Sequence, residues 1–395
     1  MLVWSGGRGA PVLWRAALWR AGRPRRLYVQ PCKPTAARRS ADEYNPGTFL
    51  PLRALTLSAH GGLDQLEYRD DIPAPELRGP RDVRLRVEAA ALNHLDLFVV
   101  GGLPGITITP PWVVGSDGAG VVDAVGAEVS AVRPGDRVVV NPGHGCGHCE
   151  YCLEGETPLC PRYHIFGEHE PGFLAEYAVV PESCVRVRPD HVTAEQAAAF
   201  SLATLTAWRM VVSRAQVRPG DQVLIWGIGG GVAIAALQIC KRIGATVWVT
   251  SSDPGKLEQA RALGADHLLD HTADDVPRVV RAATNKRGVD VVVDSVGEAT
   301  WARSLAALGR RGRLVTCGGT SGPTVQTDVR RLFWNQWTLM GSTMGSDAEY
   351  DAVVAELHAG RLVPPVDSVY ALADGRAAYE RLASGRQFGK VVVRI

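Results

Sequence analysis

The second half of the chain alternates short apolar strands with helical segments, and this alternation constrains the fold more than any other feature. The expected strands and helices occupy residues 222–227, 231–244, 246–251, 254–264, 289–297 and 313–319. Alternation of this kind specifies a parallel sheet that is covered by helices on both faces. We therefore predict a doubly wound α/β domain over residues 203–341.

The preceding residues follow a different pattern, with short strands separated by glycine and proline turns. A chain of 395 residues is long enough for two domains. We predict an all-β, barrel-like domain over residues 51–202, which contains a cysteine-rich excursion. The tail, residues 342–395, contains a helix at 347–360. It ends in a strand at 388–395 that we expect to return to the first domain.

A basic segment precedes these domains. Residues 1–41 hold nine arginines or lysines and no acidic residue, so the remainder has 34 basic and 41 acidic residues, a net charge of −7. An acidic body argues against nucleic-acid binding, and no apolar run approaches the roughly 18 residues that cross a membrane. We predict a cytoplasmic protein in which residues 1–50 are a disordered extension or an over-called start. An organelle transit peptide is the alternative.

Four cysteines crowd into fifteen residues. They are Cys146, Cys149, Cys152 and Cys160, in the pattern C-x2-C-x2-C-x7-C. Four thiolates on one loop match the closed, tetrahedral coordination of a structural zinc ion, which leaves no position for substrate. An iron–sulfur cluster is the alternative, although the spacing differs from the ferredoxin patterns. We interpret the neighbouring His144 and His148 as solvated loop residues.

A glycine-rich turn joins the first strand of the α/β domain to an apolar helix. Its residues are Gly227, Gly229, Gly230 and Gly231, followed by Val232. Glycines permit a tight turn and the close approach of a pyrophosphate, and the helix N-terminus supplies amide N–H groups and a positive dipole end. Because a strand precedes the turn and a helix follows it, we predict a dinucleotide site.

The residues after the second strand bear on which dinucleotide binds. An acidic residue at this point would bind a ribose 2′-hydroxyl and indicate NAD. Ser251 and Ser252 end the strand instead, and Lys256 follows one turn later. Hydroxyl groups and a lysine suit a 2′-phosphate, so we predict NADP(H), while the nearby Asp253 keeps NAD(H) open.

Several segments together resemble the medium-chain dehydrogenase/reductase superfamily, which includes zinc alcohol dehydrogenases and quinone reductases. These segments are ALNHLDLFVVGG (91–102), GSDGAGVVDAVGAEVSAVRPGDRVVV (115–140), the four-cysteine loop, LTAW (205–208) and GIGGGVA (227–233). The resemblance spans residues 52–395. It implies a GroES-like β-barrel catalytic domain, a Rossmann nucleotide-binding domain and a structural zinc ion.

The chain departs from the zinc alcohol dehydrogenases at the catalytic zinc. Their three ligand positions fall on Asn93, Ser116 and Leu202, so none holds a Cys or a His. The position of the Glu beside the His ligand falls on Asp117, and the proton-relay positions fall on Leu95 and Phe98. The resemblance therefore implies a member without a catalytic zinc ion, of the type that uses NADPH to reduce polarised double bonds or quinones.

The residues around that position are the candidate catalytic residues. We expect Asn93 to orient the nicotinamide ribose or a substrate oxygen, and His94 to contact phosphate or move a proton. Asp96 is expected to form an ion pair with a basic residue. Ser116 and Asp117 should line the vacated metal position, and Asp117 should fix the loop that carries Asn93.

Four more residues are expected near the cleft. Thr206 should cap it beside the nicotinamide amide. Tyr163, Glu168 and His169 follow the cysteine loop, and a Glu–His pair there could support acid–base chemistry. We favour an exposed loop of charged residues as the interpretation of this last group.

These observations favour a reductase that transfers hydride from NADPH to an enone, a quinone or another carbonyl-conjugated small molecule. One alternative is a zinc alcohol dehydrogenase with ligands drawn from His94, Asp117, Glu168 or His169. Another is a non-catalytic NADPH-binding protein. We also predict a homodimer or a dimer of dimers, in which the strand at 337–342 pairs with its two-fold mate and hides a sheet edge.

Overall fold

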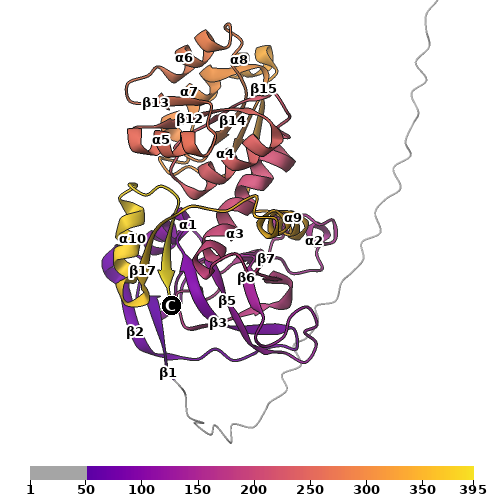
Figure 1. Ribbon diagram of the computed structural model, residues 1–395, viewed down its shortest axis with the longest axis vertical. Coiled ribbons are helices and arrows are strands. Elements are labelled where there is room, and N and C mark those ends of the chain that lie inside the picture. Colours follow the sequence, from indigo (N-terminus) through magenta and orange to yellow (C-terminus); the bar gives the residue numbers. More distant parts are fainter. Residues whose placement is uncertain (1–50) are drawn as a thin grey trace, which may run out of the picture. The chain divides into compact units, whose positions relative to one another are not determined.

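The computed structural model describes residues 51–395, so the expectations for residues 1–50 lie outside the described part of the chain. The strands of this part form two large sheets, one mostly antiparallel and one parallel (Figure 1). Within the same residues, no helix has both the length and the hydropathy that crossing a lipid bilayer requires.

The first part of the described chain is built mainly of short strands. Strands β10-β6-β5-β3-β18-β17 form the large sheet together with β9, which pairs with β3, while β2-β1-β4 and β7-β8 form two smaller sheets. The strands are β1 (Pro51–Leu57), β2 (Leu66–Pro73), β3 (Asp82–Ala91), β4 (Trp112–Val113), β5 (Asp117–Val125), β6 (Arg137–Val140), β7 (Gly143–His144), β8 (His164–Ile165), β9 (Tyr177–Pro181), β10 (Val185–Val187), β17 (Val366–Ala371) and β18 (Lys390–Arg394).

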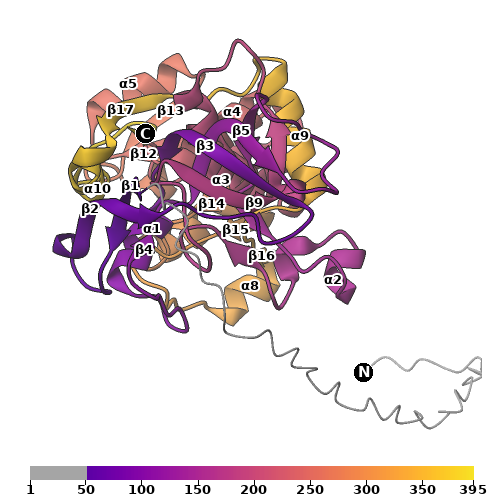
Figure 2. The ribbon, with the colours of Figure 1, turned by 90° about the horizontal axis from the view of Figure 1, so that it is seen from below.

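Five α-helices accompany these strands, and one of them continues as a π-helix. They are α1 (His94–Gly101), α2 (Glu150–Leu153), α3 (Ala194–Trp208) with its π-helical continuation η4 (Arg209–Arg214), α9 (Asp347–His358) and α10 (Gly375–Ala383). Short 3-10 turns are η1 (Leu63–Gln65), η2 (Thr157–Leu159), η3 (Glu182–Cys184) and η5 (Leu372–Asp374). The helix α2 lies on the side opposite α10 in both views (Figures 1 and 2).

The last strand returns to the first sheet, as the sequence predicts. Val392, Val393 and Arg394 of β18 pair antiparallel with the end of β3. The same strand pairs in parallel with β17. Because β3 leads directly into α1, this return places the C-terminal strand beside Asn93 and the start of α1.

The second sheet has the strand order β13-β12-β11-β14-β15-β16, and every pair in it is parallel. This is the 3-2-1-4-5-6 order of a Rossmann fold, in which ligands bind where the order reverses beyond the strand ends. Its elements are β11 (Gln222–Ile225), α4 (Gly231–Ile243), β12 (Thr246–Ser251), α5 (Pro254–Ala262), β13 (His267–Asp270), α6 (Val276–Ala283), β14 (Val289–Asp294), α7 (Glu298–Ala307), β15 (Leu308–Thr316), α8 (Val329–Asn335) and β16 (Thr338–Gly341).

Helices cover both faces of the parallel sheet. Val223 and Ile225 of β11 face a core shared with α3, α4 and α5. Leu224 and Trp226 point the other way, into a core shared with α6 and α7. This alternation explains why the strands read as continuous apolar runs, since side chains on both faces are buried.

Helix α3 belongs to both halves of the molecule. Its residues share one core with Ala89 and Ala119 of the first sheet and with α4 of the second. It begins with a capping box between Thr193 and Gln196. The predicted boundary between residues 202 and 203 therefore falls inside one continuous helix, and the exact domain boundaries stay a prediction.

Candidate active site

A buried polar network lies beside the catalytic-zinc position that the family resemblance implies, and it includes one of the three ligand positions, Asn93. The Lys390 ammonium donates to Asn93 Oδ1 at 2.5 Å and to Asp117 Oδ2 at 3.0 Å. Asn93 Nδ2 also donates to Asp117 Oδ2 at 2.9 Å. The lysine is 3% exposed and the aspartate is fully buried. The network is therefore a buried ion pair whose charged groups also make hydrogen bonds.

Three separate segments position this network. Asn93 caps α1, Asp117 begins β5 and Lys390 begins β18. The second oxygen of Asp117 accepts from the Leu202 amide of α3 at 2.9 Å. The Asp117 carboxylate thus joins the first sheet, the linking helix and the C-terminal strand at one point.

Asp96 and Ser116 form a second pair beside the network. The Ser116 hydroxyl donates to Asp96 Oδ1 at 2.8 Å, and the Asn93 amide donates to Asp96 Oδ2 at 2.6 Å. Burial raises the pKa of Asp96 to about 6, although these hydrogen bonds oppose the shift. The expected ion pair of Asp96 with a basic residue is wrong, because Asp96 caps α1 and the lysine binds Asp117 instead.

Glu168 is a buried acid close to Asp96. It is 9% exposed, and its Oε2 atom has no hydrogen-bond partner among the described residues. Burial, and then the Asp96 charge, raise the pKa of Glu168 to about 7. The interpretation of this segment as an exposed charged loop is therefore wrong for Glu168, whereas His169 is exposed.

An apolar cluster lies next to these acids. Ile165, Leu202 and Met344 are buried together, and Leu95 and Tyr163 pack against them. Thr206 is buried and contacts the Met344 sulfur at 4.0 Å. Leu202, at a former ligand position, therefore contributes a hydrocarbon surface.

His94 lies at the exposed first turn of α1. Partial desolvation of the imidazole lowers the pKa of His94, and the positive charge of Lys390 lowers it further. This shift favours the neutral imidazole, although the residue remains exposed to solvent. A neutral imidazole can donate or accept a proton but contributes no fixed positive charge toward a phosphate.

The glycine-rich turn has the shape that a pyrophosphate requires. Gly229 has a φ of +137°, and a Cβ atom on Gly231 would lie 2.9 Å from both the Ala203 Cβ and the Lys390 Cδ. Gly230 caps α4 without any side-chain hydrogen bond, so the first amides of the helix are free to bind an anion. These residues fit a dinucleotide.

Asp253 at the far end of this site serves as a helix cap. Its carboxylate accepts from the Gly255 amide at 2.7 Å and from the Lys256 amide at 3.4 Å. Ser251 is buried and its hydroxyl accepts from the Asp253 amide, while Ser252 is exposed. The only acidic side chain in this turn is thus already engaged by backbone amides.

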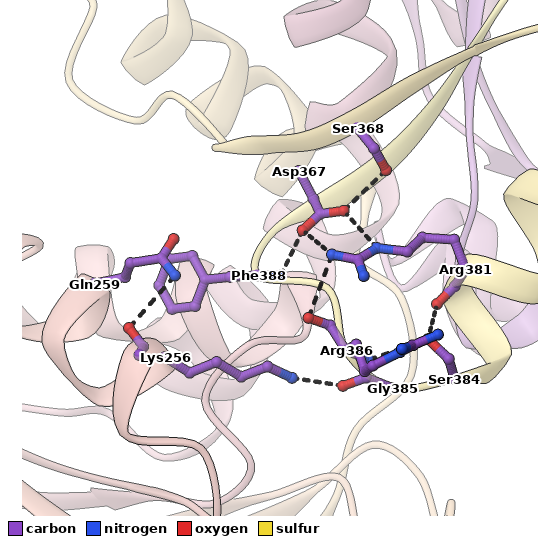
Figure 3. A network of polar contacts seen from close by, with 10 residues as sticks. Lys256, Gln259, Asp367, Ser368, Arg381, Ser384, Gly385, Arg386 and Phe388 are labelled. Carbon is purple, nitrogen blue, oxygen red and sulfur yellow. Dashed lines mark hydrogen bonds and ion pairs between the residues drawn. The ribbon is translucent and has the colours of Figure 1, made fainter.

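Lys256 crosses from the parallel sheet to the C-terminal segment. Its ammonium donates to the Gly385 carbonyl at 2.5 Å (Figure 3). Nearby, Asp367 pairs with Arg381 at 2.9 Å and accepts from the Phe388 amide. Figure 3 shows that this polar network brings Lys256 beside the loop around Arg386.

The four cysteines converge as predicted from their spacing. Their sulfur atoms lie within 4.8 Å of one another. The Cys146 and Arg162 amides donate to the Cys160 sulfur, each at 3.3 Å. A Cβ atom on Gly145 would lie 2.7 Å from the Cys152 sulfur, so only glycine fits there. Sulfur donors in this arrangement fit a tetrahedral zinc ion.

Backbone hydrogen bonds prepare one of these thiols for a metal. The His148 amide contributes most to lowering the pKa of Cys146 to about 5. Burial raises the pKa of Cys152 to about 12, and a bound dication would reverse that shift by stabilising the thiolate. The backbone hydrogen bonds to Cys146 thus favour its thiolate form, which binds cations.

An arginine of η4 attaches the cysteine loop to the rest of the fold. Arg209 is 6% exposed and pairs with Glu156 of the loop and, at 2.8 Å, with Glu349 of α9. The π-helical turn at residues 209–214 shifts the helical register at this arginine. The loop is therefore held by an ion-pair triad centred on the buried arginine, as well as by its sulfur atoms.

Two family models match the described chain. An alcohol dehydrogenase GroES-like domain matches residues 79–190, and a zinc-binding dehydrogenase domain matches residues 231–359. The chain belongs to the medium-chain dehydrogenase/reductase superfamily. It is thus an oxidoreductase with the two-domain α/β fold of that superfamily, and its cysteine loop and family match both support zinc binding.

Three superfamily members illustrate the similarity. A quinone oxidoreductase from Pseudomonas aeruginosa is 33% identical, over 86% of this chain and 99% of that protein. The crystal structure of an NAD-dependent alcohol dehydrogenase is 43% identical, with a TM-score of 0.84 over 87% and 99% of the two chains. The 2-octenoyl-CoA carboxylase reductase CinF, solved with NADP and 2-octenoyl-CoA, is 29% identical, with a TM-score of 0.81 over 88% of each.

Sequence reasoning missed the partner of the central carboxylate. Lys390 lies 273 residues from Asp117, and the only signal was a single lysine at the start of an apolar terminal strand. The structure brings Asn93, Ser116 and Asp117 together as expected. Tyr163 and Glu168 border the same site, whereas the glycine turn and Lys256 belong to the nucleotide side.

Proposed function

We propose that the protein is an NADPH-dependent reductase of enones, quinones or related carbonyl-conjugated compounds that works without a catalytic zinc ion. The observation that carries this proposal is the ion pair of Lys390 with Asp117, beside the three positions that hold the family's catalytic zinc ligands. An ammonium group already neutralises the carboxylate there, so a zinc ion would have to displace a buried positive charge.

The chemistry of the proposed substrates suits a site of this kind. Bound NADPH would supply a hydride, and the negative charge then develops on a carbonyl oxygen conjugated with the reacting carbon. Fixed hydrogen-bond donors can stabilise such a charge in a site that excludes water. An unactivated alcohol lacks this route and needs a Lewis acid to lower its pKa.

Glu168 is the best-placed proton source for the second half of the reduction. Its pKa of about 7 means that a neutral carboxyl group is available near physiological pH. The buried apolar cluster of Ile165, Leu202 and Met344 provides a surface for a hydrophobic substrate. We expect Asn93 to orient the nicotinamide ribose or a substrate oxygen, and Thr206 to contact the nicotinamide amide.

Three features support NADPH over NADH. The Asp253 carboxylate is engaged by the helix α5 amides, Ser252 is exposed, and Lys256 lies beside the loop of Arg386. A 2′-phosphate would meet hydroxyl and cationic groups there. Ser251 and the first amides of α4 would hold the remainder of the dinucleotide.

The cysteine loop is proposed to hold one structural zinc ion.

We also propose a homodimer through β16, because Phe333 and Trp334 of the adjacent α8 are 64% and 73% exposed beside that edge strand. A dimer mass in light scattering is expected, and Trp334→Asp should shift it toward the monomer. A monomeric wild type at micromolar concentration would contradict the dimer.

A substrate panel combined with metal analysis tests the proposed function. We expect the protein to oxidise NADPH in the presence of enones or quinones. The rate should be unchanged when every metal ion except the cysteine-bound zinc is removed. Activity confined to alcohols and dependent on an additional zinc ion would favour the zinc alcohol dehydrogenase instead. NADPH binding without turnover across the panel would favour a non-catalytic protein.

A further inference from the structure

A second group of metal-ligating side chains lies close to the cysteine loop but shares no residue with it. His144, His164 and Glu170 place their ligand atoms within 4.8 Å of one another. We propose that these three residues form a second zinc site, with water as the fourth ligand. The expectation that His144 is a solvated loop residue is wrong, because its side chain is only 19% exposed.

The backbone positions both histidines on one face of a short ribbon. His144 of β7 lies directly opposite His164 of β8 in the antiparallel register. Directly opposed residues in such a pair point to the same side of the strands. Ile165, the next residue along β8, points the other way into the apolar cluster of the candidate active site. The proposed zinc site therefore lies behind the active site.

Glu170 completes the group from a tight turn. Its Oε1 atom lies 2.9 Å from His164 Nδ1 and 3.2 Å from His144 Nε2. The turn is held because the Gly167 amide donates to the Glu170 carbonyl at 2.7 Å. Ligand atoms around a tetrahedral zinc ion are about 3.3 Å apart when the bonds are about 2.05 Å. The two distances from Glu170 are close to this value, and the two histidine nitrogens lie within 4.8 Å of each other.

The surroundings of His144 Nε2 favour a bound ion over a hydrogen bond to the carboxylate. His144 Nε2 is fully buried and makes no aligned hydrogen bond with any described residue, although the carboxylate oxygen lies 3.2 Å away. A lone pair directed at a shared ion would satisfy it. The competing cation, Arg78, lies 4.0 Å from the other oxygen of Glu170 and has a 66% exposed side chain, so it can move away into solvent.

The donor set identifies the class of ion. Two imidazoles and one carboxylate suit zinc and other divalent transition metals, and they disfavour the hard cations calcium and magnesium, which take oxygen ligands. Three protein ligands leave one position for water. Such an ion would tie β7 and β8 to the turn that carries Glu168, and so brace the acid without contacting the substrate.

Metal stoichiometry in the full chain tests this site. After equilibrium dialysis against buffered zinc, we expect two ions per chain in the wild type. Glu170→Gln and His164→Asn should each retain one, and His191→Asn, at an exposed histidine outside the group, should retain two. In cobalt-loaded protein, the thiolate-to-cobalt charge-transfer bands should be unchanged in every variant, which shows that the cysteine loop is intact.

Two results would overturn the proposal. One is a wild type that binds a single zinc ion under these conditions. The other is a second ion that persists in both Glu170→Gln and His164→Asn, since that ion must then lie elsewhere. Neither result depends on enzymatic activity, so this test is independent of the proposed function.

Discussion

The cysteine loop and the network of Asn93, Asp117 and Lys390 differ in how their negative charge is balanced. In the loop, four sulfur atoms converge, and the Arg162 side chain hydrogen-bonds to one of them, Cys146. A single guanidinium cannot balance four thiolates, so a cation from solution is still required. In the network, the chain itself supplies the cation, a buried lysine 3.0 Å from the carboxylate. We propose that the first arrangement depends on zinc for its fold, whereas the second has an ammonium group in place of a metal ion.

Removing one sulfur ligand should have the largest effect. Cys149→Ser is expected to release zinc and unfold the cysteine loop, because metal binding of this type contributes on the order of 10 kcal/mol to folding. Zinc content and the thermal midpoint would measure the loss. Protein that stays folded should still oxidise NADPH with substrate. A variant that loses its zinc but keeps full thermal stability would contradict a structural role.

Removing the internal cation should have the next largest effect. Lys390→Met leaves the Asp117 carboxylate buried without its counter-charge, which costs about 3–5 kcal/mol. Denaturant unfolding measures this change. The double variant Lys390→Met with Asp117→Asn removes both charges and should recover most of the stability. Equal losses in the single and double variants would show that the two charges are not coupled.

Glu168 gives a pH-dependent contrast with the paired Asp117. Because folding raises its pKa from 4.5 to about 7, its stabilising contribution is full below pH 4.5 and is lost as the pH rises to 7. The loss is roughly 3 kcal/mol. Glu168→Gln should therefore match the wild type near pH 4.5 and exceed its unfolding free energy at pH 8.

The kinetics of the same variant provide a second readout. If the neutral Glu168 carboxyl donates the proton, kcat/KM of the wild type should fall above about pH 7, and Glu168→Gln should lose that pH dependence together with most of its activity. If the stability difference between the wild type and Glu168→Gln does not vary with pH, the pKa of Glu168 is the same in the folded and unfolded states. The carboxyl group would then be ionised at neutral pH, which would contradict its role as the proton donor.

The smallest effect is expected at Lys256. Lys256→Ala should lower kcat/KM for NADPH about tenfold, or ~1.4 kcal/mol, and leave NADH nearly unchanged. Arg261→Ala, an exposed cation on the same helix, is the matched control and should alter neither. An equal loss with both cofactors would assign Lys256 to the contact with Gly385 and not to a 2′-phosphate.

The sequence predicted those features that depend on neighbouring residues. The turn at Gly227–Gly231, helix α4 and the strands β11 and β12 appear where the alternation places them. The four cysteines converge because their spacing alone brings them together. In both cases a short stretch of chain determines the geometry, so periodicity and spacing are sufficient.

The remaining features depend on contacts across the fold. Helix α8 exposes Phe333 and Trp334, so its apolar residues do not mark a buried face, and its helical character was not predicted. The partner of Asp117 is separated from it by most of the chain. The burial of Glu168 depends on the packing of its turn against α1 and β4, which no local pattern reveals.

The central claim is that zinc braces this enzyme and does not take part in its hydride chemistry. The most direct measurement is NADPH oxidation with a reducible enone by the Glu170→Gln variant after chelation to one zinc ion per chain. We expect the rate to match that of the same variant supplied with excess zinc. A rate that falls on chelation and returns with the binding of an additional ion would contradict the claim.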